Sequence, residues 1–183
     1  MSEILNDFAD WLERLATEPL PGGVASAAIA AAMGAALTYK VARIALAAKS
    51  LPGADRAAVQ SILDLAKAQQ AQLLRLSSAD EQAYRAVLEA GQAPERHLAW
   101  QQATWVPILV AEACRLLLDR LPALYAGCPP VVYVDLQIGD WLLETGVRAG
   151  LEAAETNLRV WARGPDLPTF RSRIDALQEA KVD

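Results

Sequence analysis

The chain has little of what metal, redox and disulfide chemistry needs. Its 183 residues include two cysteines, Cys114 and Cys128, and a single histidine, His97. The cysteines lack a C-x-x-C spacing, which favours two reduced thiols in a cytoplasmic protein over a disulfide framework. One histidine cannot build a metal site by itself, and no carboxylate cluster has a recognised ligand spacing. We therefore expect no metal and no permanently bound cofactor.

The sequence is also poor in strand-forming residues and in positive charge. Val, Ile and Thr together number 25, against 37 Ala and 27 Leu, which are strong helix formers. The formal net charge of −5 argues against a nucleic-acid partner, because nucleic-acid binders normally present a basic surface. The first residues lack the basic and apolar regions of a signal peptide. The longest apolar stretch, residues 24–39, is too short and too rich in alanine to span a membrane. We expect a cytoplasmic protein with no membrane partner.

A helical pattern runs through the whole chain. Its length predicts one domain, residues 1–183, that can bury a core without covalent staples. Proline and glycine clusters separate the apolar repeats. The sequence therefore predicts an all-α bundle of about six helices, several of them long, with no β-sheet. The expected helices cover about 3–18, 23–49, 54–90, 95–120, 132–163 and 167–181.

Small residues mark the helices expected in the middle of the bundle. The segment 132–163 carries Gly139, Gly146 and Gly150 on one row, although each glycine costs about 1 kcal/mol relative to alanine in a helix interior. The segment 23–49 carries further rows of small residues: Ser26, Ala30, Gly34 and Ala27, Ala31, Ala35. This pattern predicts close contact between helix backbones.

Asp80 interrupts an apolar stripe. The stripe has helical spacing and consists of Leu73, Leu76, Asp80, Tyr84 and Val87. A carboxyl group on a core-facing row is either paired or has its pKa raised by desolvation. A pKa near neutrality suits general acid/base catalysis, and Tyr84, one turn on, can donate a hydrogen bond to Asp80. The alternative is a structural carboxylate that reaches solvent or caps a helix break at Ser77–Ser78.

Two helix starts are further candidates for binding. Pro21, Gly22 and Gly23 precede or open the second expected helix, where unobstructed N–H groups form a site for an anion or a carbonyl. The alternative is a turn that needs glycine dihedral angles. Asp135 opens the fifth expected helix, where its carboxylate is either functional or simply favoured by the helix dipole.

Three cations project from the far half of the second expected helix: Lys40, Arg43 and Lys49. Lys40 and Arg43 are three residues apart and therefore share a side of the helix. These side chains are either solvated charges at the rim of the bundle or a clamp for a substrate that carries carboxylates.

Four motifs follow one another along the chain. They are Pro19-Leu20-Pro21-Gly22-Gly23 with Ser26-Ala27-Ala28 and Met33-Gly34-Ala35-Ala36-Leu37; Asp80-Glu81-Gln82-Ala83-Tyr84; Val106-Pro107; and Asp135-Leu136-Gln137-Ile138 through Gly146 to Asn157-Leu158. In this order they resemble the cyclodeaminase/cyclohydrolase family. That family comprises the C-terminal domain of formiminotransferase-cyclodeaminase and stand-alone methenyltetrahydrofolate cyclohydrolases. The resemblance spans nearly the whole chain.

The resemblance implies an all-α homodimer that binds a folate near the subunit interface, with a tetrahydrofolate derivative as its substrate. It places Asp80 where the family has a candidate proton donor or acceptor, with Tyr84 to orient it. The residues that would bind the substrate are Pro21, Gly22, Gly23, Ser26, Lys40, Arg43, Lys49, Asp135 and Asn157.

Two kinds of function remain open. The first is an enzyme of folate one-carbon metabolism that hydrolyses the methenyl bridge of 5,10-methenyltetrahydrofolate or deaminates formiminotetrahydrofolate. The second is a non-catalytic dimeric relative that serves as a ligand-binding or scaffolding module. The second is favoured by residues that depart from the family pattern: Val24, Ala25, Pro129, Val134 and Ala153. The enzyme is favoured by residues that keep it: Asp80, Tyr84, Asp135 and Asn157.

Overall fold

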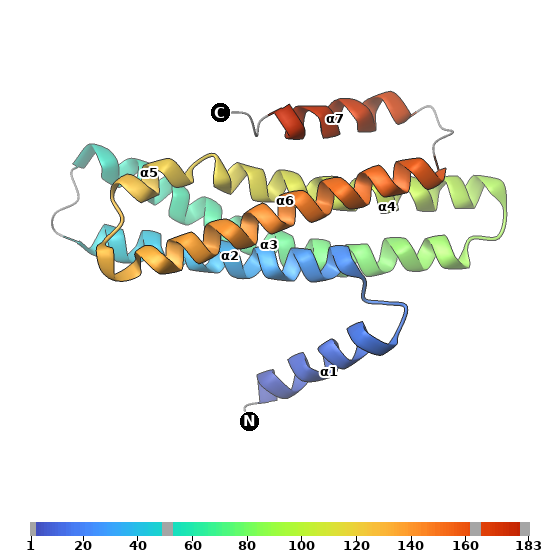
Figure 1. Cartoon of the computed structure of the whole chain (residues 1–183), viewed down its shortest axis with the longest axis horizontal. Helices are drawn as coiled ribbons and strands as arrows, with labels where there is room; N and C mark the ends of the chain where they lie inside the picture. Colours follow the sequence, from blue (N-terminus) through green and yellow to red (C-terminus); the bar gives the residue numbers. More distant parts are fainter. Residues whose placement is uncertain (1–2, 49–52, 162–165, 180–183) are drawn as a thin grey trace.

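The protein is a bundle of long helices (Figure 1). A computed structural model describes residues 3–48, 53–161 and 166–179, and these residues contain no strand. The helices are α1 (Glu3–Thr17), α2 (Gly23–Ala47), α3 (Gly53–Glu89), α4 (Ala93–Leu118), α5 (Leu121–Ala126), α6 (Tyr133–Trp161) and α7 (Leu167–Glu179). A 3-10 turn, Pro130–Val132, precedes α6. The all-α prediction is confirmed: six helices lie where the sequence puts them, and α5 is a short helix between two of the expected ranges.

Helices α2, α3, α4 and α6 form the core, and α2 packs on both α3 and α6. The buried face of α2 is almost entirely alanine: Ala25, Ala28, Ala31, Ala35, Ala42 and Ala45 have no exposed surface. By length and composition alone α2 could cross a membrane, but half of its apolar window is buried inside the bundle. It is the central helix of the core, as its small residues predicted.

Glycines mark the closest approaches between helices. Where α2 crosses α6, a Cβ added to Gly34 would lie 2.7 Å from the carbonyl oxygen of Gly139. Between α4 and α6, a Cβ added to Gly150 would collide with the carbonyl oxygen of Pro107. Real Cβ atoms do not come so close to backbone atoms, so only glycine allows these contacts. The close packing predicted from the glycine row is confirmed, and at Gly146 an added Cβ would collide with side-chain atoms of Cys114 and Ala31.

The two terminal helices differ in how they meet the core. Helix α7 lies along α4 and buries Phe170 and Ile174, with the Phe170 ring centroid 4.7 Å from that of Trp105. Helix α1 stands away from the bundle (Figure 1). Its link to the core is an ion pair, in which Arg14 Nη2 lies 3.5 Å from Glu81 Oε2 of α3. The position of α1 leaves most of its side chains in solvent.

Candidate functional site

Asp80 caps α2 from a neighbouring helix. The N-cap residue of α2, Gly22, has no side chain that could do so. Asp80 Oδ2, on α3, accepts a 3.2 Å hydrogen bond from the Ala25 N–H. The bond satisfies one of the N–H groups that a helix N-terminus leaves free, and the dipole favours negative charge there. The structural alternative of a helix break at Ser77–Ser78 is wrong, because α3 runs unbroken through both residues.

The surroundings of Asp80 raise the pKa of its carboxyl group from 3.8 to about 6. Burial is the largest cause, because desolvation penalises the charged form. The Ala25 N–H lowers the pKa because it stabilises the carboxylate, and the neighbouring Glu81 carboxylate raises it. The carboxyl group can therefore release and accept a proton near neutral pH, as its place on the apolar stripe predicted.

Two backbone donors lie beside this carboxyl group. Gly23 and Val24 open α2, and within the described ranges neither N–H has a protein acceptor. A Cβ added to Gly22 or Gly23 would meet nothing within 4 Å, so a ligand can approach these groups. Ser26 turns its hydroxyl inward and donates to the Gly22 carbonyl oxygen at 2.9 Å. The helix start thus presents open donors next to a titratable acid.

Two buried apolar residues hold the loop that leads into α2. Leu20 is 6% exposed, Pro21 is also buried, and the peptide bond between them is cis. Because its side chain is buried, Pro21 anchors the loop that leads to the free N–H groups, and it has no polar side-chain atom to offer a ligand. Its predicted role in substrate binding stays a prediction.

Tyr84 does not bond to Asp80. Among the described residues no hydrogen bond joins them, and Tyr84 is 39% exposed. Its ring meets Trp100 of α4 edge-on, with 6.3 Å between centroids and 90° between planes. The expected hydrogen bond is wrong because the α3–α4 hairpin gives the ring an aromatic partner instead. Trp100 was missed, although a fold-back centred on Gln92 places positions 84 and 100 opposite each other.

Lys40 and Asp135 meet at the other end of α2. Lys40 Nζ lies 2.8 Å from Asp135 Oδ2. Fifteen residues separate Ala25 from Lys40, which is about 22 Å along a helix. One chain therefore does not bring Lys40 to Asp80. Arg43 is exposed and has no ion pair in the described part of the chain, whereas Lys49 lies outside the described residues.

Asn157 donates a hydrogen bond to a backbone carbonyl of α4 that lacks its usual donor. Pro107 lies inside α4 and has no N–H, so the carbonyl oxygen of Ala103, four residues earlier, loses its usual donor. Asn157 Nδ2, on α6, donates to that oxygen at 2.8 Å. One N–H of the Asn157 amide is thus engaged in helix packing, which leaves its second N–H and its carbonyl oxygen for a ligand.

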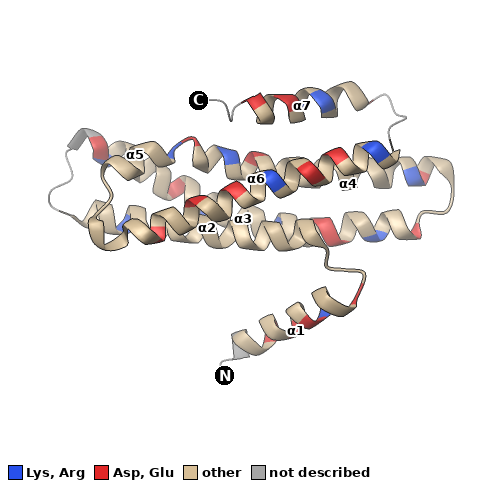
Figure 2. Ribbon diagram, in the orientation of Figure 1, with Lys and Arg blue, Asp and Glu red and all other residues tan. Residues whose placement is uncertain are grey.

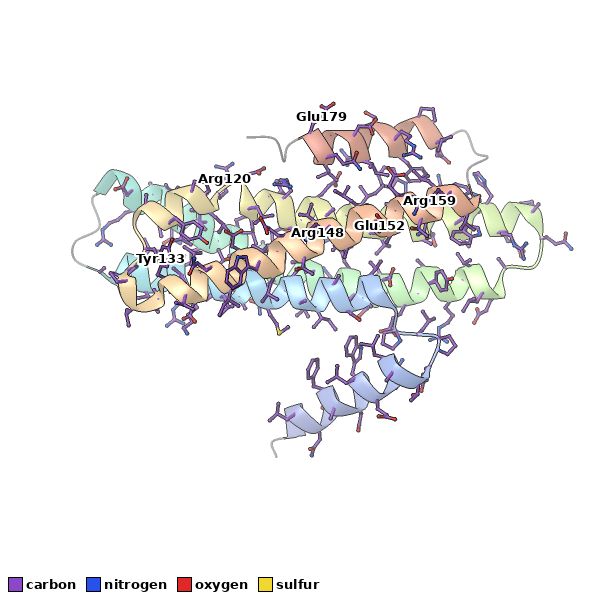
Figure 3. All side chains as sticks on the ribbon, viewed as in Figure 1. Arg120, Tyr133, Arg148, Glu152, Arg159 and Glu179 are labelled. Atoms are coloured by element: carbon purple, nitrogen blue, oxygen red, sulfur yellow. The ribbon has the colours of Figure 1, made fainter. Side chains whose placement is uncertain are left out.

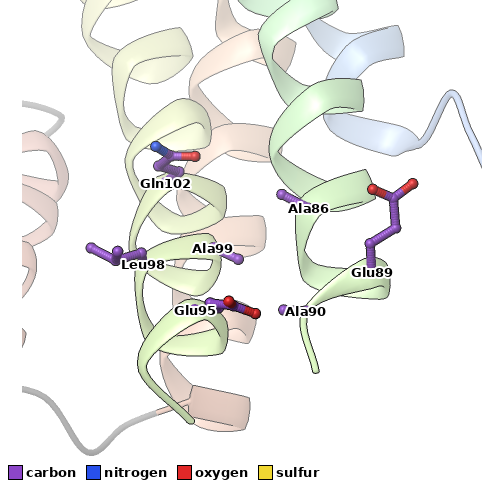
Figure 4. Close-up of a pocket in the computed structure, with 7 residues that line it drawn as sticks. All are labelled: Ala86, Glu89, Ala90, Glu95, Leu98, Ala99 and Gln102. Atoms are coloured by element: carbon purple, nitrogen blue, oxygen red, sulfur yellow. The ribbon is translucent and has the colours of Figure 1, made fainter. Parts of the chain in front are cut away.

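An open cleft of about 370 Å³ lies between the end of α3 and the start of α4 (Figure 4). Alanines form part of its wall, and Glu89 and Glu95 lie on its two sides. Paired carboxylates repel an anionic ligand, and no predicted site residue lines the cleft. Across residues 3–48, 53–161 and 166–179, no three His, Cys, Asp or Glu side chains gather as a metal site would require.

Comparison with known proteins agrees with this architecture. A family model described as formiminotransferase-cyclodeaminase matches residues 5–162. The fold is similar to the crystal structure of formiminotetrahydrofolate cyclodeaminase from Thermotoga maritima, with a TM-score of 0.78 and 20% sequence identity. That alignment covers 98% of this chain and 93% of the other. No individual curated protein matches the sequence.

Proposed function

Because the chain belongs to the formiminotransferase-cyclodeaminase family, we propose that it binds a tetrahydrofolate derivative and hydrolyses the methenyl bridge of 5,10-methenyltetrahydrofolate. The observation that carries the proposal is the Asp80 carboxyl group, with a pKa of about 6, beside the free N–H groups of Gly23 and Val24. A general acid/base works best when its pKa is close to the operating pH.

The proposed reaction needs proton transfers alone. Ionised Asp80 takes a proton from water as the water oxygen bonds to the amidinium carbon of the bridge. Asp80 then returns that proton to one nitrogen as its bond to the carbon breaks, and the hydroxyl of the adduct releases its own proton to solvent, which leaves a formamide, a free amine and one proton. The N–H groups of Gly23 and Val24 hold the adduct oxygen or a carbonyl of the pterin. We propose no resident cofactor, since no step requires one.

The aromatic pair beside Asp80 has a different role from the one expected of Tyr84. The Ala25 N–H orients the carboxyl group, so Tyr84 is free to act elsewhere. Tyr84 and Trp100 present flat apolar surface one turn beyond Asp80, which suits a planar heterocycle. We assign Tyr84 to substrate binding in place of proton transfer.

The glutamate tail of the folate would meet Lys40 and Arg43 of a second copy in a homodimer. Within one chain Lys40 and Arg43 lie about 22 Å and about 27 Å along α2 from Ala25, where Asp80 caps the helix. Met33, which is 48% exposed, lies midway between Ala25 and Lys40. A two-fold axis near Met33 would run the two α2 helices antiparallel and bring the second copy's cations toward Asp80.

We also propose a cytoplasmic location, which the two free cysteines fit.

The test is loss of 5,10-methenyltetrahydrofolate absorbance on addition of the purified protein. Asp80→Asn keeps the size of the side chain but removes its proton, and we expect turnover to fall about 100-fold or more. Asp64→Asn, an exposed carboxylate on the same helix, is the matched control and leaves turnover unchanged.

Formiminotetrahydrofolate, followed by release of ammonia, tests deamination as the alternative reaction. The competing function is a non-catalytic binding module, favoured by the apolar Val24 side chain beside the free N–H groups. Folate binding without turnover of either substrate would establish that module. Absence of both binding and turnover would refute the folate proposal altogether.

A further inference from the structure

Helix α1 carries an apolar face that its own bundle does not cover. Leu5, Phe8 and Leu12 follow one another at spacings of three and four and are 53%, 39% and 45% exposed. The Phe8 ring stacks on Trp11 of the same helix, with 5.9 Å between centroids. Without a packing partner, an isolated helix of 15 residues is marginal in water. The sequence of α1 therefore calls for a surface to pack against.

Helix α6 carries a second uncovered face, which we call the α6 stripe: Val134, Ile138 and Trp141. These side chains are 62%, 38% and 60% exposed and lie on one side of the helix, at spacings of four and three. Met33 of α2 adds to the exposed apolar surface of the α2–α6 pair, which the Gly34–Gly139 crossing brings together. Farther along α6 the exposed residues become charged, as Arg148, Glu152 and Arg159 show in Figure 3.

The two faces complement each other in length and charge. The apolar residues of α1 span Leu5 to Leu15, about 15 Å, and the α6 stripe spans about 10 Å, with the same side of α6 continuing to Arg148 at about 21 Å. Residues 3–18 contain five acidic side chains and one basic one, and Figure 2 shows acidic turns along α1. Arg148 is exposed and has no ion pair among the described side chains. It is placed to meet an acidic helix at the end of the stripe.

We propose that α1 of each chain packs its apolar face on the α6 stripe of a second copy, so that two chains exchange their N-terminal helices. Both faces belong to the same chain, so one two-fold axis closes both contacts at once. The α1–α2 loop, residues 18–22, holds each α1 outside its own bundle and within reach of a neighbour (Figure 1). A membrane surface is the poorer occupant, because interfacial helices carry a basic polar face and α1 is acidic.

This inference rests on the homodimer in the proposed function, but not on its chemistry. A dimer that forms by other surfaces would refute the exchange and leave the folate proposal standing. A folate-inactive protein with exchanged helices would do the reverse. Assembly and turnover are therefore measured separately.

The first experiment measures the dissociation constant of the full chain by analytical ultracentrifugation. Phe8→Asp on α1 and Trp141→Asp on the α6 stripe should each raise it about 10-fold or more, because each places a charge in the interface. Leu116→Asp, at an apolar residue on α4 that is 51% exposed, is the matched control and should leave it unchanged. Circular dichroism should show a folded bundle in all three, since each of the three side chains is exposed. A wild-type monomer, or dissociation caused by the control alone, overturns the proposal.

The second experiment decides between exchange and packing within one chain. Two variants, Leu12→Cys and Ile138→Cys, are made in a Cys128→Ser background, because Cys114 is buried. A short bis-maleimide should join the two variants only when they are mixed, as a covalent heterodimer. A single chain that carries both cysteines should give a covalent dimer. An internal link in that chain, found by mass spectrometry in a monomer, overturns the exchange.

Discussion

Two effects act on the pKa of the Asp80 side chain in opposite directions. As the cap of α2 it is best charged, because the free N–H groups and the helix dipole favour an anion. As a half-buried group on the α3 stripe it is best neutral, because burial costs the charged form its hydration. Burial has the larger effect and raises the pKa to about 6, and the hydrogen bond from the Ala25 N–H limits this rise. A carboxyl group tuned in this way loses and regains a proton easily at physiological pH.

The raised pKa has a consequence for stability. Between pH 3.8 and 6 the folded protein binds more protons at Asp80 than the unfolded chain does, so stability falls as the pH rises through this window. Asp80→Asn removes the titration. Relative to wild type, the free energy of unfolding of the variant should rise from pH 4 to pH 7 by at most about 3 kcal/mol. Solvent screening at this half-buried site reduces that upper value.

Urea unfolding of both proteins at several pH values measures this difference. Asp64→Asn is the control and should follow the wild-type curve, because its side chain is exposed. A constant offset between Asp80→Asn and wild type over the whole range would contradict the raised pKa.

The sequence predicted the raised pKa of Asp80 but not its partner. A carboxylate on an apolar stripe signals desolvation through spacing alone. The donor, Ala25, lies 55 residues away, and no local pattern links the two. The Tyr84–Asp80 hydrogen bond failed for a related reason: one helical turn brings two residues to the same face, but the neighbouring helix decides where a long side chain turns.

At the scale of the element, two residues of α6 accommodate Pro107, the proline inside α4. Gly150 lets the Pro107 carbonyl oxygen approach, and Asn157 supplies the hydrogen bond that Pro107 cannot. The glycine row, visible in the sequence, predicted the close contact. The role of Asn157 needed the register between the two helices, which spacing within α6 does not define. The sequence did not show that the apolar face of α1 is uncovered. An amphipathic pattern predicts that a face is buried, but it does not identify the surface that covers it.

The partnership between Asn157 and Pro107 predicts a thermodynamic coupling. Asn157→Ala leaves the Ala103 carbonyl oxygen without a donor and should cost about 1–2 kcal/mol of unfolding free energy. In a Pro107→Ala background, residue 107 regains its N–H and can donate to Ala103, so the same change should cost less. Urea unfolding of the four proteins gives the coupling energy.

Equal costs of Asn157→Ala in the two backgrounds would show that the bond does not compensate for the proline. The Michaelis constant for the folate, measured on the same proteins, separates this role from substrate binding. A rise in that constant with no loss of stability would assign Asn157 to the ligand instead.

At the scale of the whole molecule, the proposed site is divided between the ends of α2. The acid and the open N–H groups lie at its start, and Lys40 and Arg43 lie in its far half. A rigid helix cannot shorten the distance of about 22 Å between them. Only a second chain, or a long ligand, can bring cations and acid together on one folate. The spacing along one predicted helix implies this separation, but the sequence did not place Asp80 at the start of that helix.

The division predicts how the length of the glutamate tail affects binding. A polyglutamylated folate should bind more tightly than the monoglutamate by about 3-fold for each ion pair it gains, which is typical of exposed pairs. Raising the ionic strength should erode this gain, because salt screens exposed charges. Combining Lys40→Ala with Arg43→Ala should abolish the gain, and it should weaken binding of the polyglutamate more than binding of the monoglutamate. Asp135→Asn should increase the gain, since it frees Lys40 from its ion pair. Titration calorimetry with both folates at two salt concentrations measures all of these effects, and equal affinities in the wild type would leave the cations as surface charge.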